Sequence, residues 1–478
     1  MRRLLALLAI GSMIGSASAQ TRGPAISPER HDAAKAMLER LVNTPTVLGR
    51  GQVPAMATYL AEQYKAAGFP AADVQVLPYQ TVRAVDKTTD ETAALMVRWR
   101  VPGAKAKPVM LLGHMDVVEA KLEDSTADPF KLVERDGYYY GRGTLDMKGG
   151  LTDITQALIE LRKQGFKPTR EIVVFFTGDE ETNGIGATKG ATEWRQLMGD
   201  PEFGLNADGG GIDFTSEGTP RLATIQTAEK TYADYTFTVR NRGGHSSKPR
   251  TDNAIYQLSH ALERLQAHRF QPMLNETTRA YFAARAKVAE PELAAAMTKW
   301  LADPDDAAAA DAVEASESEV GLTRTRCVAT RLFGGHADNA LPQLATANVN
   351  CRIFPGVTPD QVLAELTKVA GDPELVVTRN DRYVASLASP LRPDITAAFT
   401  KAVTTLHPGM PVAPEMSTGA SDARPFRVAG IPVYGVDGIW IRSPEDLRAH
   451  GKDERIPVAA LDDGIRHWIM LVGELAGK

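Results

Sequence analysis

The sequence has 478 residues, of which 43% are hydrophobic and 24% are charged, so the chain can bury more than one core and two domains are expected. Its 54 Lys and Arg residues against 59 Asp and Glu residues give a net charge of −5, which excludes the basic surface that binding to nucleic acid or anionic lipid requires. Beyond the N-terminus, no apolar stretch approaches the roughly 20 residues that cross a bilayer, so we expect no membrane partner.

The N-terminus has the pattern of a signal peptide over residues 1–19. Two arginines precede an apolar run at residues 4–10, and Ala17 and Ala19 are the small residues that a signal peptidase reads. The apolar run is too short to span a bilayer, which disfavours a membrane anchor. We therefore expect cleavage after Ala19 and export of the protein, to the periplasm or by secretion.

The first half of the remaining chain predicts an α/β sheet covered by helices. Residues 108–112 and 171–176 are short apolar runs bounded by turn residues, which is typical of strands buried on both faces of a parallel sheet. Apolar side chains between these runs recur at helical spacing, which makes a strand–helix–strand unit. The pattern predicts helices over residues 32–41, 55–67 and 151–161, and a returning strand over residues 432–436.

From about Lys230 the pattern changes to an alternation of apolar and polar residues, which indicates antiparallel strands with one exposed face. The order β-α-β-β-α-β is that of a ferredoxin-like α+β domain. Strands are predicted over residues 230–240, 323–332, 346–354 and 374–378, and helices over residues 255–265 and from Thr358 onward. An Ala-rich stretch at residues 275–319 predicts a helical insertion. We therefore expect one α/β domain from residues 20–228 and 385–478, with a ferredoxin-like domain inserted at residues 229–384.

Residues that can bind a metal follow the predicted buried strands. His114 comes directly after the strand at residues 108–112, and Glu180 and Glu181 follow the next buried strand. Asp146 precedes the helix between these strands and so lies at the same edge of the sheet. Because open α/β sheets place their sites at the carboxyl ends of strands, we expect these groups to converge. Zinc takes mixed His and carboxylate ligands, and one carboxylate can bridge two metal ions.

Five segments of the chain carry further residues of this kind. They are Leu-Gly-His-Met-Asp-Val-Val at 112–118, Gly-Arg-Gly-Thr-Leu-Asp-Met-Lys-Gly at 141–149, Thr-Gly-Asp-Glu-Glu-Thr at 177–182, Asn-Ala-Asp at 206–208 and His-Gly-Lys-Asp-Glu at 450–454. In this order, the five segments resemble the M20 family of dinuclear zinc metallopeptidases, which includes carboxypeptidases, dipeptidases and aminoacylases. The resemblance runs from about Asp32 to the C-terminus and implies a catalytic α/β domain with an inserted lid domain.

The resemblance implies that the protein holds two zinc ions, with Co²⁺ or Mn²⁺ as alternatives in vitro. Asp146 is implied as the ligand that bridges the two ions. The implied ligands of one ion are His114, Asp146 and Asp208, and those of the other are Asp146, Glu181 and His450. Asp213 lies close to Asp208 in the sequence and is the alternative to it.

Further roles near the metals follow from the same resemblance. Glu180 is implied as the general base that takes a proton from the attacking water. Asp116 is implied as the acceptor of a hydrogen bond from His114, which would fix the tautomer of that imidazole. A cis peptide bond is implied between Asp146 and Met147.

The inserted domain resembles the family's lid, through which two copies would form a homodimer. His245 would reach into the active site of the partner subunit and polarise the scissile carbonyl. Asn339 and Arg352 would contact the substrate, with Arg352 binding a terminal carboxylate. A plain surface arginine is the other interpretation of Arg352. Gly419 lies in the loop that resembles the lining of the substrate pocket.

These features predict an exported, zinc-dependent exopeptidase, a carboxypeptidase or dipeptidase, that cleaves an amide bond next to a free carboxylate. An N-acyl amino acid hydrolase needs the same carboxylate clamp and remains an alternative. A catalytically silent peptide-binding protein is disfavoured, because every expected position is occupied. Ser125 and Thr126 stand where larger family members carry Trp, so the shape of the substrate pocket stays open.

The only two cysteines, Cys327 and Cys351, lie on neighbouring predicted strands. If these strands pair antiparallel about a centre near Asn339, the two cysteines lie almost opposite each other. Export would permit a disulfide bond between them. Two free thiols, packed as small apolar side chains, are the equally open alternative.

Overall fold

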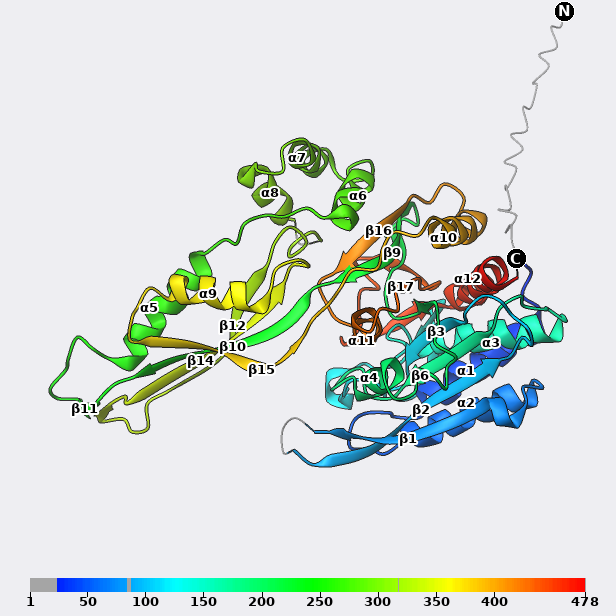
Figure 1. The fold of residues 1–478 in the computed structure, drawn as a ribbon, viewed down its shortest axis with the longest axis horizontal. Coiled ribbons are helices and arrows are strands. Elements are labelled where there is room, and N and C mark those ends of the chain that lie inside the picture. Colours follow the sequence, from blue (N-terminus) through cyan, green and yellow to red (C-terminus); the bar gives the residue numbers. More distant parts are fainter. Residues whose placement is uncertain (1–23, 84–86, 317, 478) are drawn as a thin grey trace, which may run out of the picture.

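The computed structural model describes residues 24–83, 87–316 and 318–477. The predicted signal peptide at residues 1–19 lies outside these residues. Figure 1 shows a helix-covered sheet from which a long, narrower arm extends. Among the described residues, no helix combines the length and the apolar character that crossing a membrane requires.

The main body is built on a sheet of ten strands in the order β1-β2-β6-β3-β7-β17-β9-β8-β18, with β16 beside β9. Its central strands β6, β3, β7 and β17 are parallel to one another. Every residue of β3 and β6 is buried, as their continuous apolar runs predict. The strands are β1 (Val74–Val82), β2 (Thr89–Trp99), β3 (Val109–His114), β6 (Ile172–Thr177), β7 (Phe203–Asn206), β8 (Gly211–Thr215), β9 (Pro220–Glu229), β16 (Val412–Ser417), β17 (Val433–Gly435) and β18 (Trp440–Ser443).

Helices cover both faces of this sheet and bury two separate apolar cores. The larger core lies under α1 (Pro28–Val42), α2 (Val53–Ala66), α3 (Lys148–Lys163), α10 (Pro393–Leu406) and α12 (Val458–Ala476). The smaller core lies under α4 (Ile185–Ala191) and α11 (Ala423–Val428) on the other face. The mixed α/β class predicted from the sequence is therefore confirmed, and both ends of the described chain contribute to one sheet.

The main body also contains a smaller sheet, which has the order β19-β5-β4. This sheet pairs residues 455–457 with residues 138–140 and so joins segments from the two parts of the chain that flank the arm. The remaining short elements of the main body are η1 (Ala71–Asp73), η2 (Leu122–Asp124), β4 (Val133–Arg135), β5 (Tyr138–Tyr140) and β19 (Arg455–Pro457).

The arm contains a four-stranded antiparallel sheet in the order β12-β14-β10-β15, which is the strand order of a ferredoxin-like unit. Its helices bury the alternating apolar side chains of β10 and β14. The elements are β10 (Thr231–Arg240), α5 (Ala254–Ala267), β12 (Arg326–Gly334), β14 (Leu344–Ile353), α9 (Pro359–Ala370) and β15 (Leu375–Val384). Strand β15 runs six residues beyond the predicted end at residue 378. The prediction stopped too early because the second half of the strand is mostly polar and lacks an apolar pattern.

Two short strands, β11 (Gly244–His245) and β13 (Ala340–Leu341), pair with each other at the far end of the arm. Figure 1 places β11 far from strands β3 and β6 of the main sheet. This end of the arm is called the tip below.

The predicted insertion is helical, as expected. Helices α6 (Glu276–Arg285), α7 (Pro291–Ala302) and α8 (Ala307–Glu314) enclose a small core of their own that includes Phe282 and Trp300. Helix α6 packs against β16 and β9 of the main sheet, as Figure 1 shows. The insertion therefore covers one end of the main body instead of lengthening the arm.

Cys327 and Cys351 form a disulfide bond. They are direct partners in the antiparallel register of β12 and β14, which is the pairing that their positions predict. Of the two alternatives, the bridge is the one present.

Candidate metal centre

The carboxyl ends of neighbouring strands bring the predicted metal ligands together. His114 is the last residue of β3, and Glu180 and Glu181 lie three and four residues after β6. Asp208 lies two residues after β7, and Asp146 lies two residues before α3. This is the sheet edge at which open α/β proteins place their sites. His450 reaches the same edge from the loop after β18.

Two groups of potential ligands share His114. In one group, ligand atoms of His114, Asp146 and Glu181 lie within 4.8 Å of one another, and in the other the same holds for His114, Glu180 and Asp208. His450 Nε2 lies 2.9 Å from Glu181 Oε1 and 3.1 Å from Asp146 Oδ2.

Asp146 has the position that a bridging ligand needs. Its Oδ1 lies 3.1 Å from Nε2 of His114, and its Oδ2 lies 3.1 Å from Nε2 of His450. Each carboxylate oxygen therefore faces a different histidine. The peptide bond between Asp146 and Met147 is cis, as the resemblance implied.

The structure places Asp208, and not Asp213, at this centre. A carboxylate oxygen of Asp208 lies 4.0 Å from His114 Nε2. Asp213 lies on β8 and forms an ion pair with Arg221 at 3.1 Å. Asn206 holds the Asp208 backbone, because its side chain donates to the Asp208 carbonyl oxygen and accepts from the Asp208 amide.

The centre carries more negative than positive charge. Burial raises the pKa of both Glu180 and Asp208 well above the usual range. Burial would also raise the pKa of Asp146, but hydrogen bonds with His114 and His450 lower it instead. Hydrogen bonds with Asp146 and Glu181 raise the pKa of His450 to about 10. Crowded carboxylates with imidazoles among them are a donor set that fits divalent metal ions.

Asp116 supports the centre through its backbone as well as its carboxylate. His114 Nδ1 lies 3.0 Å from the carbonyl oxygen of Asp116 and 3.6 Å from its carboxylate, so the carbonyl is the nearer acceptor. The carboxylate accepts hydrogen bonds at 3.1 Å from the amides of Glu180 and Glu181. Asp116 therefore fixes the loop that carries both glutamates.

An ion pair that the sequence did not single out joins two of the ligand loops. Arg142 Nη1 donates to Glu454 at 2.6 Å, and both side chains are almost fully buried. Arg142 Nη2 also donates to the carbonyl oxygens of His450 and Gly451, each at 3.1 Å. Glu454 accepts from the amide of Asp146 at 3.0 Å. The pair thus connects the backbone of the bridging aspartate to the loop of His450.

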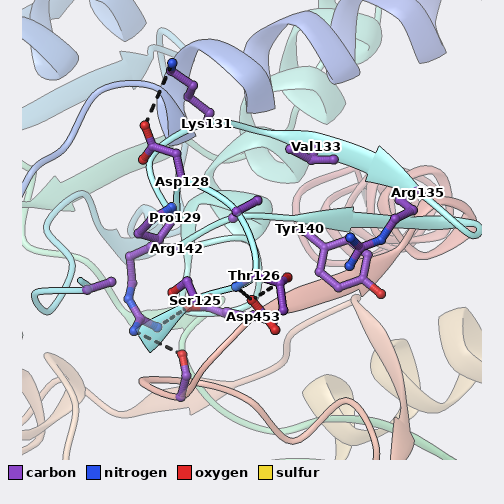
Figure 2. A pocket seen from close by; sticks show the side chains of 15 residues that line it. Ser125, Thr126, Asp128, Pro129, Lys131, Val133, Arg135, Tyr140, Arg142 and Asp453 are labelled. Carbon is purple, nitrogen blue, oxygen red and sulfur yellow. Dashed lines mark hydrogen bonds and ion pairs between the residues drawn. The ribbon is translucent and has the colours of Figure 1, made fainter. Parts of the chain in front are cut away.

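The backbone of His450 has φ 62°, in the left-handed region that residues other than glycine rarely adopt. The hydrogen bonds from Arg142 help to hold this unfavourable conformation. Figure 2 shows Arg142 beside a small surface pocket next to this loop. In the same pocket, the amide and hydroxyl of Thr126 donate to Asp453 at 2.8 and 3.0 Å. Ser125 and Thr126, where the sequence departs from the family, therefore line a pocket outside the metal-binding group.

The predicted substrate contacts fall at two places. His245 is exposed at the tip, where Ser246 donates a backbone hydrogen bond to Asn339 at 3.1 Å. Arg352 lies at the other end of β14, where its Nη1 donates to the carbonyl oxygen of Thr418 at 3.4 Å. Gly419 follows directly, and its amide donates to Ser417 Oγ at 3.0 Å. One chain therefore joins Arg352 to the Gly419 loop and holds His245 and Asn339 far from its own metal centre.

One further acidic residue near the centre comes from the loop after Gly419. Asp422 accepts a hydrogen bond from the hydroxyl of Thr177, at the end of β6. Burial raises the pKa of Asp422 to about 7. Its place inside the loop at residues 417–423 was the only signal in the sequence that could have indicated it.

Comparisons with known proteins agree with this geometry. The chain matches the model of peptidase family M20/M25/M40 over residues 110–474. It is 30% identical over 372 residues to the N-fatty-acyl-amino acid synthase/hydrolase PM20D1 of Xenopus tropicalis, covering 76% of this chain and 72% of the relative. It is 26% identical over 382 residues to the probable carboxypeptidase S-like 2 of Dictyostelium discoideum, covering 76% of this chain and 71% of the relative.

Among solved structures, the di-peptidase Dug1p of Saccharomyces cerevisiae superimposes with a TM-score of 0.69 at 17% identity, covering 94% of this chain and 98% of that one. This likeness supports the fold. The family match spans most of the chain, including every candidate metal ligand. The chain is therefore a member of peptidase family M20/M25/M40 and a hydrolytic enzyme.

Proposed function

We propose that the protein is a metal-dependent exopeptidase that releases an amino acid by cleaving the amide bond next to a free carboxylate. The observation that carries the proposal is Asp146, which lies between two histidines with Glu180 close by. Such a centre can hold two metal ions, and it gives a water molecule a carboxylate that can accept its proton.

The residues present fit two divalent ions, for which zinc is the proposed metal. Asp146 would bridge them. His114 and Asp208 would complete one site, and Glu181 and His450 the other. When bound, such ions supply a positive charge that polarises the scissile carbonyl and lowers the pKa of a nearby water.

Glu180 has the proton-transfer role in this proposal. It lies in the group with His114 and Asp208, and Asp116 fixes its backbone amide. Glu180 accepts a proton from the attacking water and then passes it to the nitrogen of the leaving amine.

Arg352 is the proposed clamp for the terminal carboxylate. Its guanidinium lies 4.9 Å from the centre of the Tyr232 ring and close to Thr418, so its position is restrained from two sides. Arginine binds carboxylates with paired hydrogen bonds, which gives both affinity and orientation. A clamp on a free carboxylate selects exopeptidase action over cleavage inside a chain.

We extend the proposal to a homodimer formed through the arm. Among the residues that the structure describes, strand β12 pairs only with β14, so its other edge is open. Three apolar side chains of this strand, Val328, Leu332 and Phe333, are more than half exposed. An open edge with apolar side chains is suited to pairing with another strand. A two-fold axis near the middle of β12 would place the partner's tip beside the start of this strand.

A large cavity of about 870 Å³ lies at that place, lined by residues that include Arg326, Val328, Arg352 and Thr418. His245 of the partner subunit would then approach the clamp and the Gly419 loop. This arrangement accounts for a histidine that lies far from its own metal centre, and it makes His245 a catalytic residue only in the dimer.

A second candidate is hydrolysis of N-acyl amino acids. It is favoured by the similarity to the N-fatty-acyl-amino acid synthase/hydrolase of Xenopus tropicalis. Such a substrate offers the same amide bond and the same free carboxylate to the centre.

Export through the N-terminal segment at residues 1–19 is also part of the proposal and agrees with the disulfide bond between Cys327 and Cys351.

The test is a panel of dipeptides, longer peptides and N-acyl amino acids, with release of the free amino acid as the measurement. We expect turnover that a chelator abolishes and added zinc restores. Preferred turnover of peptides supports the exopeptidase, and preferred turnover of N-acyl amino acids supports the second candidate. Cleavage of peptides with an amidated C-terminus at an equal rate would contradict the carboxylate clamp.

A further inference from the structure

A second cavity, of about 350 Å³, lies between the helical insertion and the main sheet. Its lining includes Leu145, the neighbour of Asp146, and Gly210, two residues beyond Asp208. Consecutive Cα atoms are about 3.8 Å apart, so the cavity begins within one or two residues of two candidate metal ligands.

The walls of this cavity combine aliphatic side chains with charged ones, and most of the charged groups are acidic. The insertion contributes Tyr281, Arg285 and Glu319, so the cavity exists only because the insertion packs against the sheet. The charged residues from the main body are Asp213, Arg221, Glu415 and Asp437. Four carboxyl groups thus face two guanidinium groups.

Both arginines of the cavity have an acidic partner. Arg285 Nε donates to Glu319 at 3.0 Å, and Arg221 pairs with Asp213 at 3.1 Å. The Arg285 side chain is only 7% exposed, yet its Nη1 has no hydrogen-bond partner among the residues that the structure describes. A buried donor without a partner is costly, so Arg285 is suited to a ligand that brings a hydrogen-bond acceptor.

Two carboxyl groups of the cavity have no cationic partner. Glu415 accepts hydrogen bonds from the Thr224 hydroxyl and the Gly210 amide, and Asp437 accepts from the Ile439 amide at 3.2 Å. Within the described parts of the chain, neither forms an ion pair with Lys, Arg or His. Burial raises the pKa of Glu415, and it raises that of Asp437 to about 7. Both changes are expected where carboxyl groups lack a nearby positive charge.

We propose that this cavity binds the amino-terminal part of a short peptide substrate. The free ammonium group pairs with Glu415 and Asp437, and a backbone carbonyl accepts a hydrogen bond from Arg285. The inference rests on the proposed exopeptidase function and makes it more specific. Arg352 would bind the carboxyl end of the substrate, and the cavity would bind its amino end.

This subsite separates the two candidate substrate classes. A long apolar acyl chain in the cavity would bury the charged groups of Arg285, Glu415 and Asp437 without giving them any partner, which is unfavourable. An ammonium group restores a counter-charge to both carboxylates. The cavity volume of about 350 Å³ is at the lower end of the range for ligand pockets, so it can hold only a short part of a peptide. We therefore expect substrates of two or three residues to fit best.

The experiment compares matched tripeptides with a free or an acetylated amino terminus. Binding is measured by calorimetry on the full chain carrying Glu180→Gln, and hydrolysis is measured on the wild-type chain. Hydrogen bonds between charged groups predict binding that is about tenfold to a hundredfold tighter for the free amine. Glu415→Gln, which keeps the shape of the side chain, should bring this ratio close to one.

Two further variants make the result specific. Asp437→Asn should reduce the same ratio, which provides an independent test if Glu415→Gln fails to fold. Glu217→Gln changes an exposed residue in the turn between β8 and β9 and should leave the ratio as in the Glu180→Gln parent. Equal binding of free and acetylated peptides in the parent protein, or an unchanged ratio in both cavity variants, would overturn the subsite.

The binding and hydrolysis measurements fail in different ways. Tight binding of free-amine peptides without any hydrolysis by the wild-type chain would contradict the proposed exopeptidase and leave the subsite supported. Hydrolysis of acetylated and free peptides at equal rates, with equal binding, would leave the exopeptidase supported and remove the subsite.

Discussion

The metal centre and the tip of the arm differ in how complete each is within one chain. The ligand loops of the centre are held in place within one chain, since Asp116 fixes the glutamate loop, and Arg142 and Glu454 join the loops of Asp146 and His450. The tip presents exposed residues that touch no part of the centre in their own chain. In the dimer that we propose, one chain carries all of its proposed metal ligands, whereas the catalytic histidine at its centre is His245 of the partner subunit.

Glu180→Gln should cause the largest loss of activity of any change at the centre. Because the amide cannot accept the proton of the attacking water, we expect turnover to fall by about 10²- to 10⁴-fold. Metal content, measured by mass spectrometry, should stay as in the wild type. Glu193→Gln, at an exposed ion pair with Lys189, is the matched control and should keep full turnover. Retained turnover in Glu180→Gln would assign the proton transfer to another group.

Mixing two inactive variants tests whether His245 acts in the active site of a second chain. We expect His245→Ala and Glu180→Gln each to be inactive when pure. In a refolded equal mixture, half of the dimers contain one chain of each kind, and each of these has one complete site, so about a quarter of wild-type activity should return. A mixture as inactive as its parents, or a fully active His245→Ala protein of monomeric mass, would show that the tip does not act on a partner.

Removal of Glu454 tests the bracing of the centre. Glu454→Ala leaves the charge of Arg142 buried without its acidic partner, so we expect the free energy of unfolding to fall by about 3 to 5 kcal/mol. Urea denaturation followed by circular dichroism measures this loss. Glu134→Gln breaks an exposed ion pair with Lys35 and should cost less than about 1 kcal/mol. Equal costs for the two variants would mean that the buried pair does not brace the centre.

The disulfide bond gives the smallest expected effect, and that effect should be confined to the arm. Replacing both Cys327 and Cys351 by Ala removes a cross-link over 24 residues, for which about 3 kcal/mol of stability is expected. Metal content should not change, because neither cysteine contacts the centre. Loss of metal from this double variant would show that the arm and the centre are not independent.

The sequence was sufficient to predict those features of the fold and the site that depend on one local pattern of residues. The apolar runs of β3 and β6 predict strands buried on both faces, and His114 and Glu181 at their ends follow from that placement. The register of Cys327 and Cys351 follows from the alternation of their strands. These features need no information from distant parts of the chain.

The sequence was insufficient where distant segments meet. Arg142 and Glu454 lie 312 residues apart, and no local pattern indicates that they pair. The packing of α6 against β16 is equally invisible to helical periodicity, which gives a buried face and not its partner. For the same reason the acidic cavity beside the insertion became apparent only from the structure.

The central claim is that one chain holds two metal ions that share Asp146, and metal stoichiometry tests it most directly. Mass spectrometry of purified protein after dialysis against dilute zinc should give two ions per chain for the wild type. We expect one ion per chain for His450→Gln, and loss of both for Asp146→Asn, since each ion depends on the shared carboxylate. Two retained ions in Asp146→Asn, or a wild-type protein that binds none, would contradict the account.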